Sequence, residues 1–155
     1  MFIPPEIQVF LISMSPVGEL RASIPIGIGI FHMSWIKALL ISFFGNTTAV
    51  IFVLFGLDKI ADYLSKRSKI IACFLNWLFN RTKRKYEKRF LVWKEFALIA
   101  FIAIPLPGTG GWTGAVCAYL FGIPYRKAIP LISLGIFIAG VITTICAIGV
   151  IKIAL

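Results

Sequence analysis

The chain has 155 residues, of which 59% are hydrophobic and 14% are charged, and its formal net charge is +10. An ordinary soluble domain is closer to half apolar and a quarter charged, and a domain this small has too little interior to hide the apolar excess. Nucleic-acid binding is excluded as well, because most Lys and Arg residues form one block at 59–94 between apolar segments. This pattern is typical of a single-domain, multi-pass protein of the cell membrane whose basic loop lies in the cytoplasm.

The first apolar stretch, 7–31, is interrupted in its middle by 15–21, which reads SPVGELR. A charge at mid-membrane depth costs about 2.5–3.5 kcal/mol on insertion scales, so Glu19 and Arg21 are candidate functional residues. Arg21 can hold a phosphate or carboxylate with two parallel N–H groups, and Glu19 can act as its counter-ion or as a proton carrier. The alternative is an exposed loop in which both charges are solvated. The N-terminus lacks the basic residues of a signal peptide, so we expect this stretch to be retained.

The second apolar stretch, 38–57, has no charge and predicts a transmembrane helix over 35–57. It is about 30 Å long as a helix, which matches the hydrocarbon thickness of a bilayer. Asn46 lies at its middle and either lines a polar cavity or forms a hydrogen bond between helices.

The segment 58–95 contains the basic block and a short apolar run at 70–79. This run is too short to span a membrane. We expect an amphipathic helical linker that either lies in the membrane interface, with its basic flanks on lipid phosphates, or packs on the membrane domain.

The third apolar stretch, 96–125, is again interrupted, and 127–153 predicts a second transmembrane helix. The interruption at 105–114 reads PLPGTGGWTG, and its prolines and glycines exclude a regular helix. Because free backbone groups in lipid cost several kcal/mol each, this segment either lines a watery cavity as a hairpin tip or is a turn between two full helices. A tip would offer helix amino ends and amides to an anion, together with the side chains of Thr109, Trp112 and Thr113.

The two halves of the chain correspond at an offset of 90 residues, which pairs Gly18 with Gly108, Lys37 with Lys127 and Gly45 with Gly135. With the basic loop inside, this order predicts an all-α membrane protein built from two inverted repeats, an arrangement common in transporters. The first repeat is 1–57 (re-entrant hairpin 7–31, transmembrane helix 35–57), the linker is 58–95, and the second repeat is 96–155 (re-entrant hairpin 96–125, transmembrane helix 127–153).

Catalytic and metal chemistry have no support in the sequence. The three cysteines, Cys73, Cys117 and Cys146, are widely spaced, and His32 is the single histidine, so no disulfide framework or metal site is indicated. The chain also lacks a nucleophile–base pair, a P-loop and a dinucleotide fingerprint. We therefore expect neither an enzyme nor a cofactor.

Two motifs resemble those of the small multidrug export protein family. The segment 19–27, ELRASIPIG, is similar to its E-x-R-x-x-x-P-x-G element, and 105–114 is similar to its P-x-P-G-T-G-x-W-T-G element. That family in turn resembles the DedA/VTT membrane protein superfamily, which shares two re-entrant hairpins bearing a Glu and an Arg. The resemblance implies these site residues: Glu19, Arg21, Pro25, Pro105, Pro107, Gly108, Thr109, Gly110, Trp112 and Thr113.

DedA-like proteins are associated with the movement of lipids, including polyprenyl phosphate carriers, and with proton-linked drug tolerance. The resemblance therefore implies a transporter of an anionic lipid or polyprenyl phosphate, with a proton-coupled multidrug exporter and a non-transporting scaffold as alternatives. The second hairpin here has no charge between Glu95 and Arg126, so a carboxylate pair across the two hairpins is not expected. Membrane lipid is the expected partner. The chain has few helices with which to enclose a path, so a homodimer is an open alternative to a monomer. Small residues would allow close helix contact in it: Gly45, Ala49, Gly135, Ala139 and Gly140.

Overall fold

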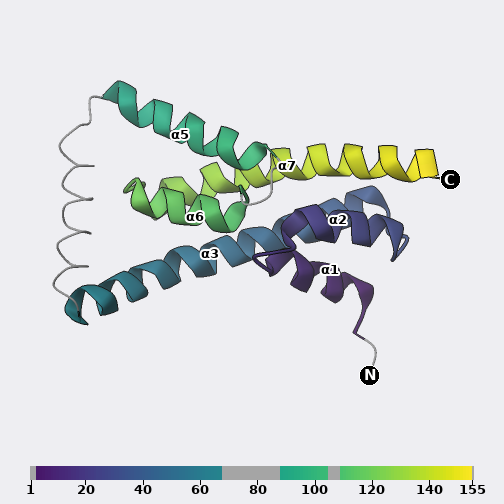
Figure 1. The fold of residues 1–155 in the computed structure, drawn as a ribbon, viewed down its shortest axis with the longest axis horizontal. Coiled ribbons are helices and arrows are strands. Elements are labelled where there is room, and N and C mark those ends of the chain that lie inside the picture. The colour runs from purple at the N-terminus through teal and green to yellow at the C-terminus, as the bar shows by residue number, and fades with distance from the viewer. Residues whose placement is uncertain (1–2, 68–87, 105–108, 155) are drawn as a thin grey trace.

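The computed structural model describes residues 3–67, 88–104 and 109–154, and all regular structure in these ranges is α-helical (Figure 1). The helices are α1 (Pro5–Met14), α2 (Glu19–Gly29), α3 (Trp35–Arg67), α5 (Lys88–Ala103), α6 (Gly111–Leu120) and α7 (Tyr125–Ala154). The expected all-α class is confirmed. The linker helix expected around 70–79 lies outside the described residues.

Two of these helices are long and apolar enough to cross a membrane, judged by length and composition. The qualifying segments are Trp35–Leu57 of α3 and Tyr125–Ile153 of α7. Each is an almost uncharged run of roughly bilayer length, which is why the sequence already indicated both. α3 continues past Leu57 to Arg67, into the segment expected to be linker.

The other four helices form two helical hairpins, α1–α2 and α5–α6. In Figure 1 the first hairpin opens toward the end of the molecule that holds both termini, and the second opens toward the opposite end. Their turns meet near the middle, beside α3 and α7. The first break is shorter than the sequence indicated: it covers 15–18, because α2 begins at Glu19 and continues through Pro25. The second break is also shorter, since α6 begins at Gly111.

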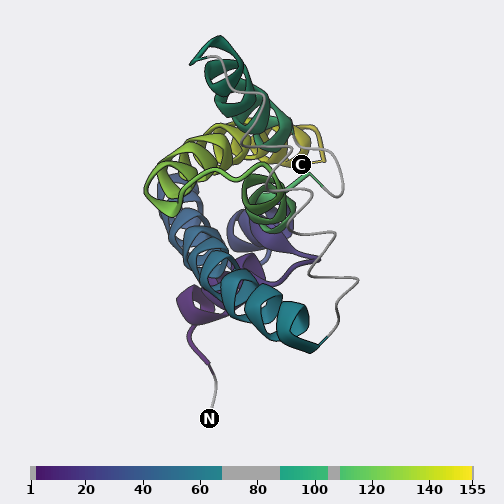
Figure 2. The ribbon, with the colours of Figure 1, turned by 90° about the vertical axis from the view of Figure 1, so that its left-hand side faces the viewer.

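Seen from one end, α6 lies in front of α2, inside an arc formed by α5, α7, α3 and α1 (Figure 2). In Figure 1 the same two helices follow one another along the length of the molecule. α2 and α6 are therefore arranged end to end, and both begin at the turns. The buried core fills the space between them and the long helices, with Ile24, Ile102, Ile132 and Ile136 among its members.

Glycines at matching positions of α3 and α7 let a hairpin helix approach closely. A Cβ on Gly45 would overlap Ser13 Oγ and lie 2.7 Å from the Phe10 carbonyl of α1. A Cβ on Gly135 would lie 2.8 Å from Ile102 Cβ and 3.3 Å from the Ile99 carbonyl of α5. Each half of the chain therefore packs its first hairpin helix on its long helix in the same way.

The small residues expected at a dimer interface are used within the chain instead. Gly45, Gly135 and Gly140 contact neighbouring helices, and Ala49 and Ala139 are buried. The homodimer itself stays a prediction, but these five residues do not supply its interface.

We expect Gly45→Ala to lower the unfolding temperature in detergent, because an added methyl in a filled space typically costs about 1–3 kcal/mol. The matched control is Gly56→Ala on the same helix, where a Cβ would meet nothing within 4 Å. The unfolding temperatures of the two variants can be compared by thermal unfolding monitored with circular dichroism. Equal unfolding temperatures would contradict the close contact between α1 and α3.

Candidate functional site at the meeting of two hairpin turns

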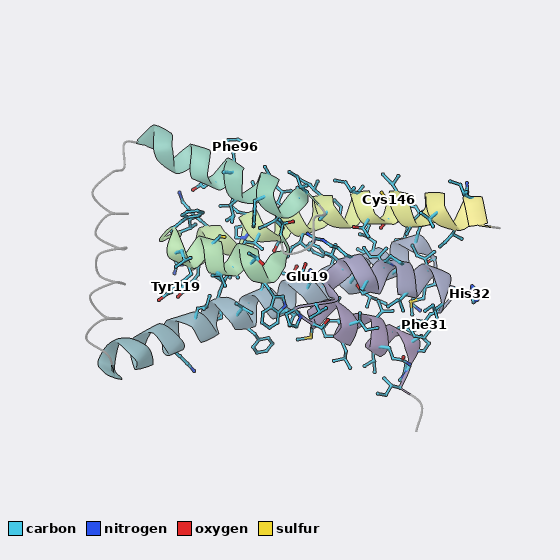
Figure 3. The ribbon with its side chains drawn as sticks, viewed as in Figure 1. Glu19, Phe31, His32, Phe96, Tyr119 and Cys146 are labelled. Carbon is cyan, nitrogen blue, oxygen red and sulfur yellow. The ribbon has the colours of Figure 1, made fainter. Side chains whose placement is uncertain are left out.

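The site is built from helix ends, because α2 and α6 begin, and α1 and α5 end, where the two turns meet. A helix amino end carries free N–H groups and a partial positive charge, and a carboxyl end carries free C=O groups and a partial negative charge. Two amino ends that face one another therefore produce a positive potential between them. Figure 3 places Glu19 at this central position, while His32 lies at the far end of α2.

Glu19 occupies the amino end of α6. Its carboxylate interacts with the backbone N–H groups of Gly111 and Trp112, the first two residues of α6. The preceding residue, Gly110, provides no side-chain cap and packs against the carboxylate so closely that a Cβ there would overlap it. Glu19 is only 8% exposed and has a φ of 45°, in the left-handed region that is unfavourable for a glutamate. The fold thus holds this carboxylate at the start of a helix in the other hairpin.

Arg21 connects the first hairpin to the end of α5. Its Nη2 donates to Thr109 Oγ1 at 3.0 Å and to the Ile104 carbonyl at 3.5 Å. Thr109 Oγ1 in turn donates to the same carbonyl at 2.7 Å. The guanidinium therefore neutralises the carboxyl end of α5 and is oriented by a hydroxyl from the turn before α6.

Trp112 forms the reverse connection, from the second hairpin to the end of α1. Its indole Nε1 donates to the Met14 carbonyl at 3.1 Å. Met14 and Ile104 are 90 positions apart in the sequence, which is the repeat offset. In each hairpin, a side chain of the second helix thus donates a hydrogen bond to a carbonyl at the carboxyl end of the other hairpin's first helix.

Glu19 and Arg21 form no ion pair with each other within 4.0 Å, although both lie in the described part of the chain. The ion pairs seen there are Lys37–Glu6 at 2.7 Å and Lys127–Glu95 at 3.4 Å. Each of these joins the start of a long helix to the first helix of its hairpin. Glu19 and Arg21 instead interact with the ends of α6 and α5.

A row of buried polar side chains leads from the site along the contact between α2 and α3. Ser23 Oγ donates to Ser42 Oγ at 2.7 Å, and one turn further from the site Gly27 packs against Ala38. This antiparallel register places Asn46 opposite Glu19, one turn from the serine pair in the other direction.

Asn46 has an unsatisfied acceptor at this position. Its side chain is 1% exposed, and its Oδ1 has no hydrogen-bond partner within the described ranges. The same oxygen lies 2.7 Å from the position that a Cβ on Gly111 would take, so it faces the first residue of α6. The neighbouring Thr47 Oγ1 is likewise buried without a partner in the described chain. A buried acceptor without a donor is costly, so Asn46 indicates a site that is completed by another group.

A family model described as "Putative small multi-drug export protein" matches residues 19–142 of the chain. The chain belongs to this family. The match begins at Glu19, directly after the first hairpin turn, and includes α2, α3, the second hairpin and most of α7. Together with the two long apolar helices, membership indicates a membrane transport protein. No curated protein and no solved structure matches the chain.

In this family member, the structure brings together six of the residues singled out from the sequence: Glu19, Arg21, Asn46, Thr109, Gly110 and Trp112. Pro25 lies inside α2 and Thr113 in the first turn of α6, and neither contributes a contact to the helix ends described above. Pro105, Pro107 and Gly108 lie outside the described residues.

Sequence reasoning missed two kinds of contributors to the site of this family member. The Met14 and Ile104 carbonyls accept the cross-hairpin hydrogen bonds, but a backbone group leaves no signature in a sequence. Gly111 contributes its backbone N–H to Glu19, and its lack of a side chain lets Asn46 approach α6. The adjacent glycines at 110–111 could have indicated this role, because paired glycines often permit close approach of another group. As for metals, the described ranges hold no cluster of three or more His, Cys, Asp or Glu side chains that could bind one.

Proposed function

We propose that this transporter moves lipids with an anionic head group, such as a polyprenyl phosphate, across the membrane. The observation that carries the proposal is a half-buried guanidinium, Arg21, beside two helix amino ends that face one another. Guanidinium groups and helix amino ends are the two protein features best suited to phosphate. The proposal includes no catalytic step.

Arg21 has donors for such a head group that no described residue uses. A guanidinium has five N–H donors, and both hydrogen bonds of Arg21 leave from Nη2. No partner of Nε or Nη1 is found among the described residues. These two nitrogens form one edge of the planar group, which can bind two oxygens of a phosphate in parallel.

For the membrane arrangement we propose that both hairpins are re-entrant and that the halves are inverted repeats, with 59–94 in the cytoplasm. The reciprocal hydrogen bonds to Met14 and Ile104 support this, as do the matching ion pairs of Lys37 and Lys127. Residues at each turn then lie near mid-membrane, where irregular backbone must be enclosed by protein or line a cavity.

Cysteine labelling in intact cells tests this arrangement. In a variant without native cysteines, we expect Ile3→Cys and His32→Cys to react with a membrane-impermeant maleimide from outside, because both ends of the first hairpin lie on that face. Gly122→Cys, next to the start of α7, should react only after permeabilisation. Labelling of positions 3 and 32 from opposite sides would show that the first hairpin spans the membrane.

A proton-coupled exporter of small cationic molecules is the alternative, and it fits the family name equally well. Glu19 favours it, since a buried carboxylate near the free acceptor of Asn46 is suited to a cation. The arrangement of charges opposes it, because the helix amino ends and Arg21 make the same position positive.

Transport assays on reconstituted vesicles separate these functions. We expect the protein to accelerate exposure of a fluorescent polyprenyl phosphate to an external quencher, and to have little effect on the matching polyprenyl alcohol. Faster movement of a cationic dye, with no effect on the phosphate, would favour the exporter. Activity toward neither probe would favour the third reading, a non-transporting scaffold.

A further inference from the structure

The anion site at the amino end of α6 already contains an anion, the carboxylate of Glu19. It interacts with the N–H groups of Gly111 and Trp112, and the Cα of Gly110 lies against it. These are the groups that a lipid head group would otherwise use at this helix end. A phosphate and the Glu19 carboxylate cannot both occupy this position.

Charge also opposes simultaneous binding. Arg21 is the charged residue that acts on Glu19, and the groups of α6 and α3 that face the carboxylate are neutral amides and Asn46. In the described parts of the other neighbouring helices, the charges lie toward the helix ends: Glu6 on α1, and Arg126, Lys127 and Lys152 on α7. A second anion beside Glu19 would therefore leave an uncompensated negative charge in a low-dielectric surrounding.

Asn46 provides a hydrogen-bond acceptor for a displaced and protonated Glu19. A protonated carboxyl gains an O–H donor, and Asn46 Oδ1 is a buried acceptor with no donor among the described residues. The register set by Ser23–Ser42 and Gly27–Ala38 places this oxygen opposite Glu19. The same protein thus has a hydrogen-bond partner for each form of Glu19: backbone N–H donors for the carboxylate and the Asn46 Oδ1 acceptor for the acid.

We infer that Glu19 is an exchangeable occupant of the anion site: the lipid head group replaces its carboxylate at the amino end of α6, and Glu19 takes up a proton as it leaves. The proton comes from solvent water and forms the O–H bond of the carboxyl group, which donates to Asn46 Oδ1. The charge of the site is then the same before and after a monoanionic head group binds. Binding of the anion and of the proton are linked, so each favours the other.

This inference rests on the proposed function, and calorimetry can separate the two. The probe is dihexanoyl phosphatidylglycerol, whose phosphodiester keeps one charge at the pH values used, and the reference is the zwitterionic dihexanoyl phosphatidylcholine. Titrations at about pH 6 and about pH 8, in buffers of different ionisation enthalpy, count the protons taken up with the probe. The protein is purified at full length in neutral detergent.

Wild-type protein is expected to take up close to one proton per bound probe at the higher pH, and to bind more weakly there. Glu19→Gln should bind with no proton uptake and, at the higher pH, about tenfold or more tightly than wild type, because its neutral side chain competes poorly for the amides. The matched control is Glu6→Gln, which removes an exposed carboxylate far from the turns and should behave like wild type. Asn46→Leu, with Ser42→Ala as its control, should shift the proton-linked binding to lower pH.

The results that would contradict the exchange differ from those that would contradict the proposed function. Preferential binding of phosphatidylglycerol without proton uptake, or with equal uptake in wild type and Glu19→Gln, overturns the exchange and leaves the proposed function standing. If neither protein prefers the anionic probe at either pH, the proposed function fails, and the exchange fails with it. A wild-type proton count near zero overturns the exchange even if a variant does not fold.

Discussion

Replacing Gly110 with alanine is expected to abolish transport and to destabilise the protein. The backbone at Gly110, with φ −93° and ψ −167°, is extended and open to alanine, so backbone strain plays no part. The added methyl would overlap the Glu19 carboxylate, which would have to leave the amino end of α6 or push that helix away. Overpacking of this kind costs about 1–3 kcal/mol, and the methyl would remain where a head group must bind.

A double-mutant cycle isolates the cause. In a Glu19→Ala background the carboxylate is gone, so Gly110→Ala should lower the unfolding temperature much less than it does in wild type. Transport should stay lost in the double variant, because the methyl still fills the site. Gly29→Ala is the control, since its Cβ would meet only Ile151 Cδ1 at an ordinary 3.8 Å. Equal destabilisation by Gly110→Ala in both backgrounds would show that Glu19 is not the group it displaces.

The sequence predicted the long helices and the places where the chain turns. α3 and α7 were visible because each is an apolar run of bilayer length, a property that needs no tertiary contact. The turns were visible because Pro16, Gly18 and the Pro and Gly residues of 105–114 interrupt such runs. The start of α2 was placed too late, because Glu19 and Arg21 look like part of the break when the groups that compensate them are unknown.

The site could be predicted only as a set of candidate residues. The sequence left open whether Glu19 and Arg21 pair with each other or have separate partners. In the structure their partners are separate: Glu19 interacts with the amino end of α6, and Arg21 donates to the carboxyl end of α5. These contacts join residues more than 80 positions apart in the sequence, and they depend on two hairpins meeting turn to turn. The same dependence explains Asn46, whose position opposite Glu19 follows from the packing register of α2 on α3 and not from any local pattern.

The occupied helix end also alters the expectation drawn from the sequence. The tip at 105–114 was expected to offer free amides to an anion, and in the structure Glu19 already interacts with the first two amides of α6. The Glu19 carboxylate therefore satisfies these amides, which removes the cost of leaving them without a hydrogen-bond partner in an apolar surrounding. In the proposed transporter a head group would have to compete with Glu19, and Arg21 is the charged group that would favour the head group.

Arg21→Ala is accordingly expected to reduce translocation of polyprenyl phosphate by at least tenfold. Hydrogen bonds to charged groups contribute about 1.5–3 kcal/mol, and Arg21 also holds the turn through Thr109 and Ile104. Arg21→Lys separates these roles: it keeps the charge but has no planar edge for two phosphate oxygens, so it should recover only part of the rate. Fluorescence quenching in reconstituted vesicles measures the rates, with unfolding temperatures recorded alongside.

Arg126→Ala is the control for loss of positive charge, because Arg126 is exposed on the first turn of α7. It should transport like wild type. A wild-type rate for Arg21→Ala would remove the central support for anion transport. Full activity of Arg21→Lys, with Arg21→Ala inactive, would reduce the role of Arg21 to that of a point charge. The exchange with Glu19 would then depend on charge compensation alone. A lysine at position 21 has the same charge as the arginine, although it lacks the planar guanidinium that binds two phosphate oxygens.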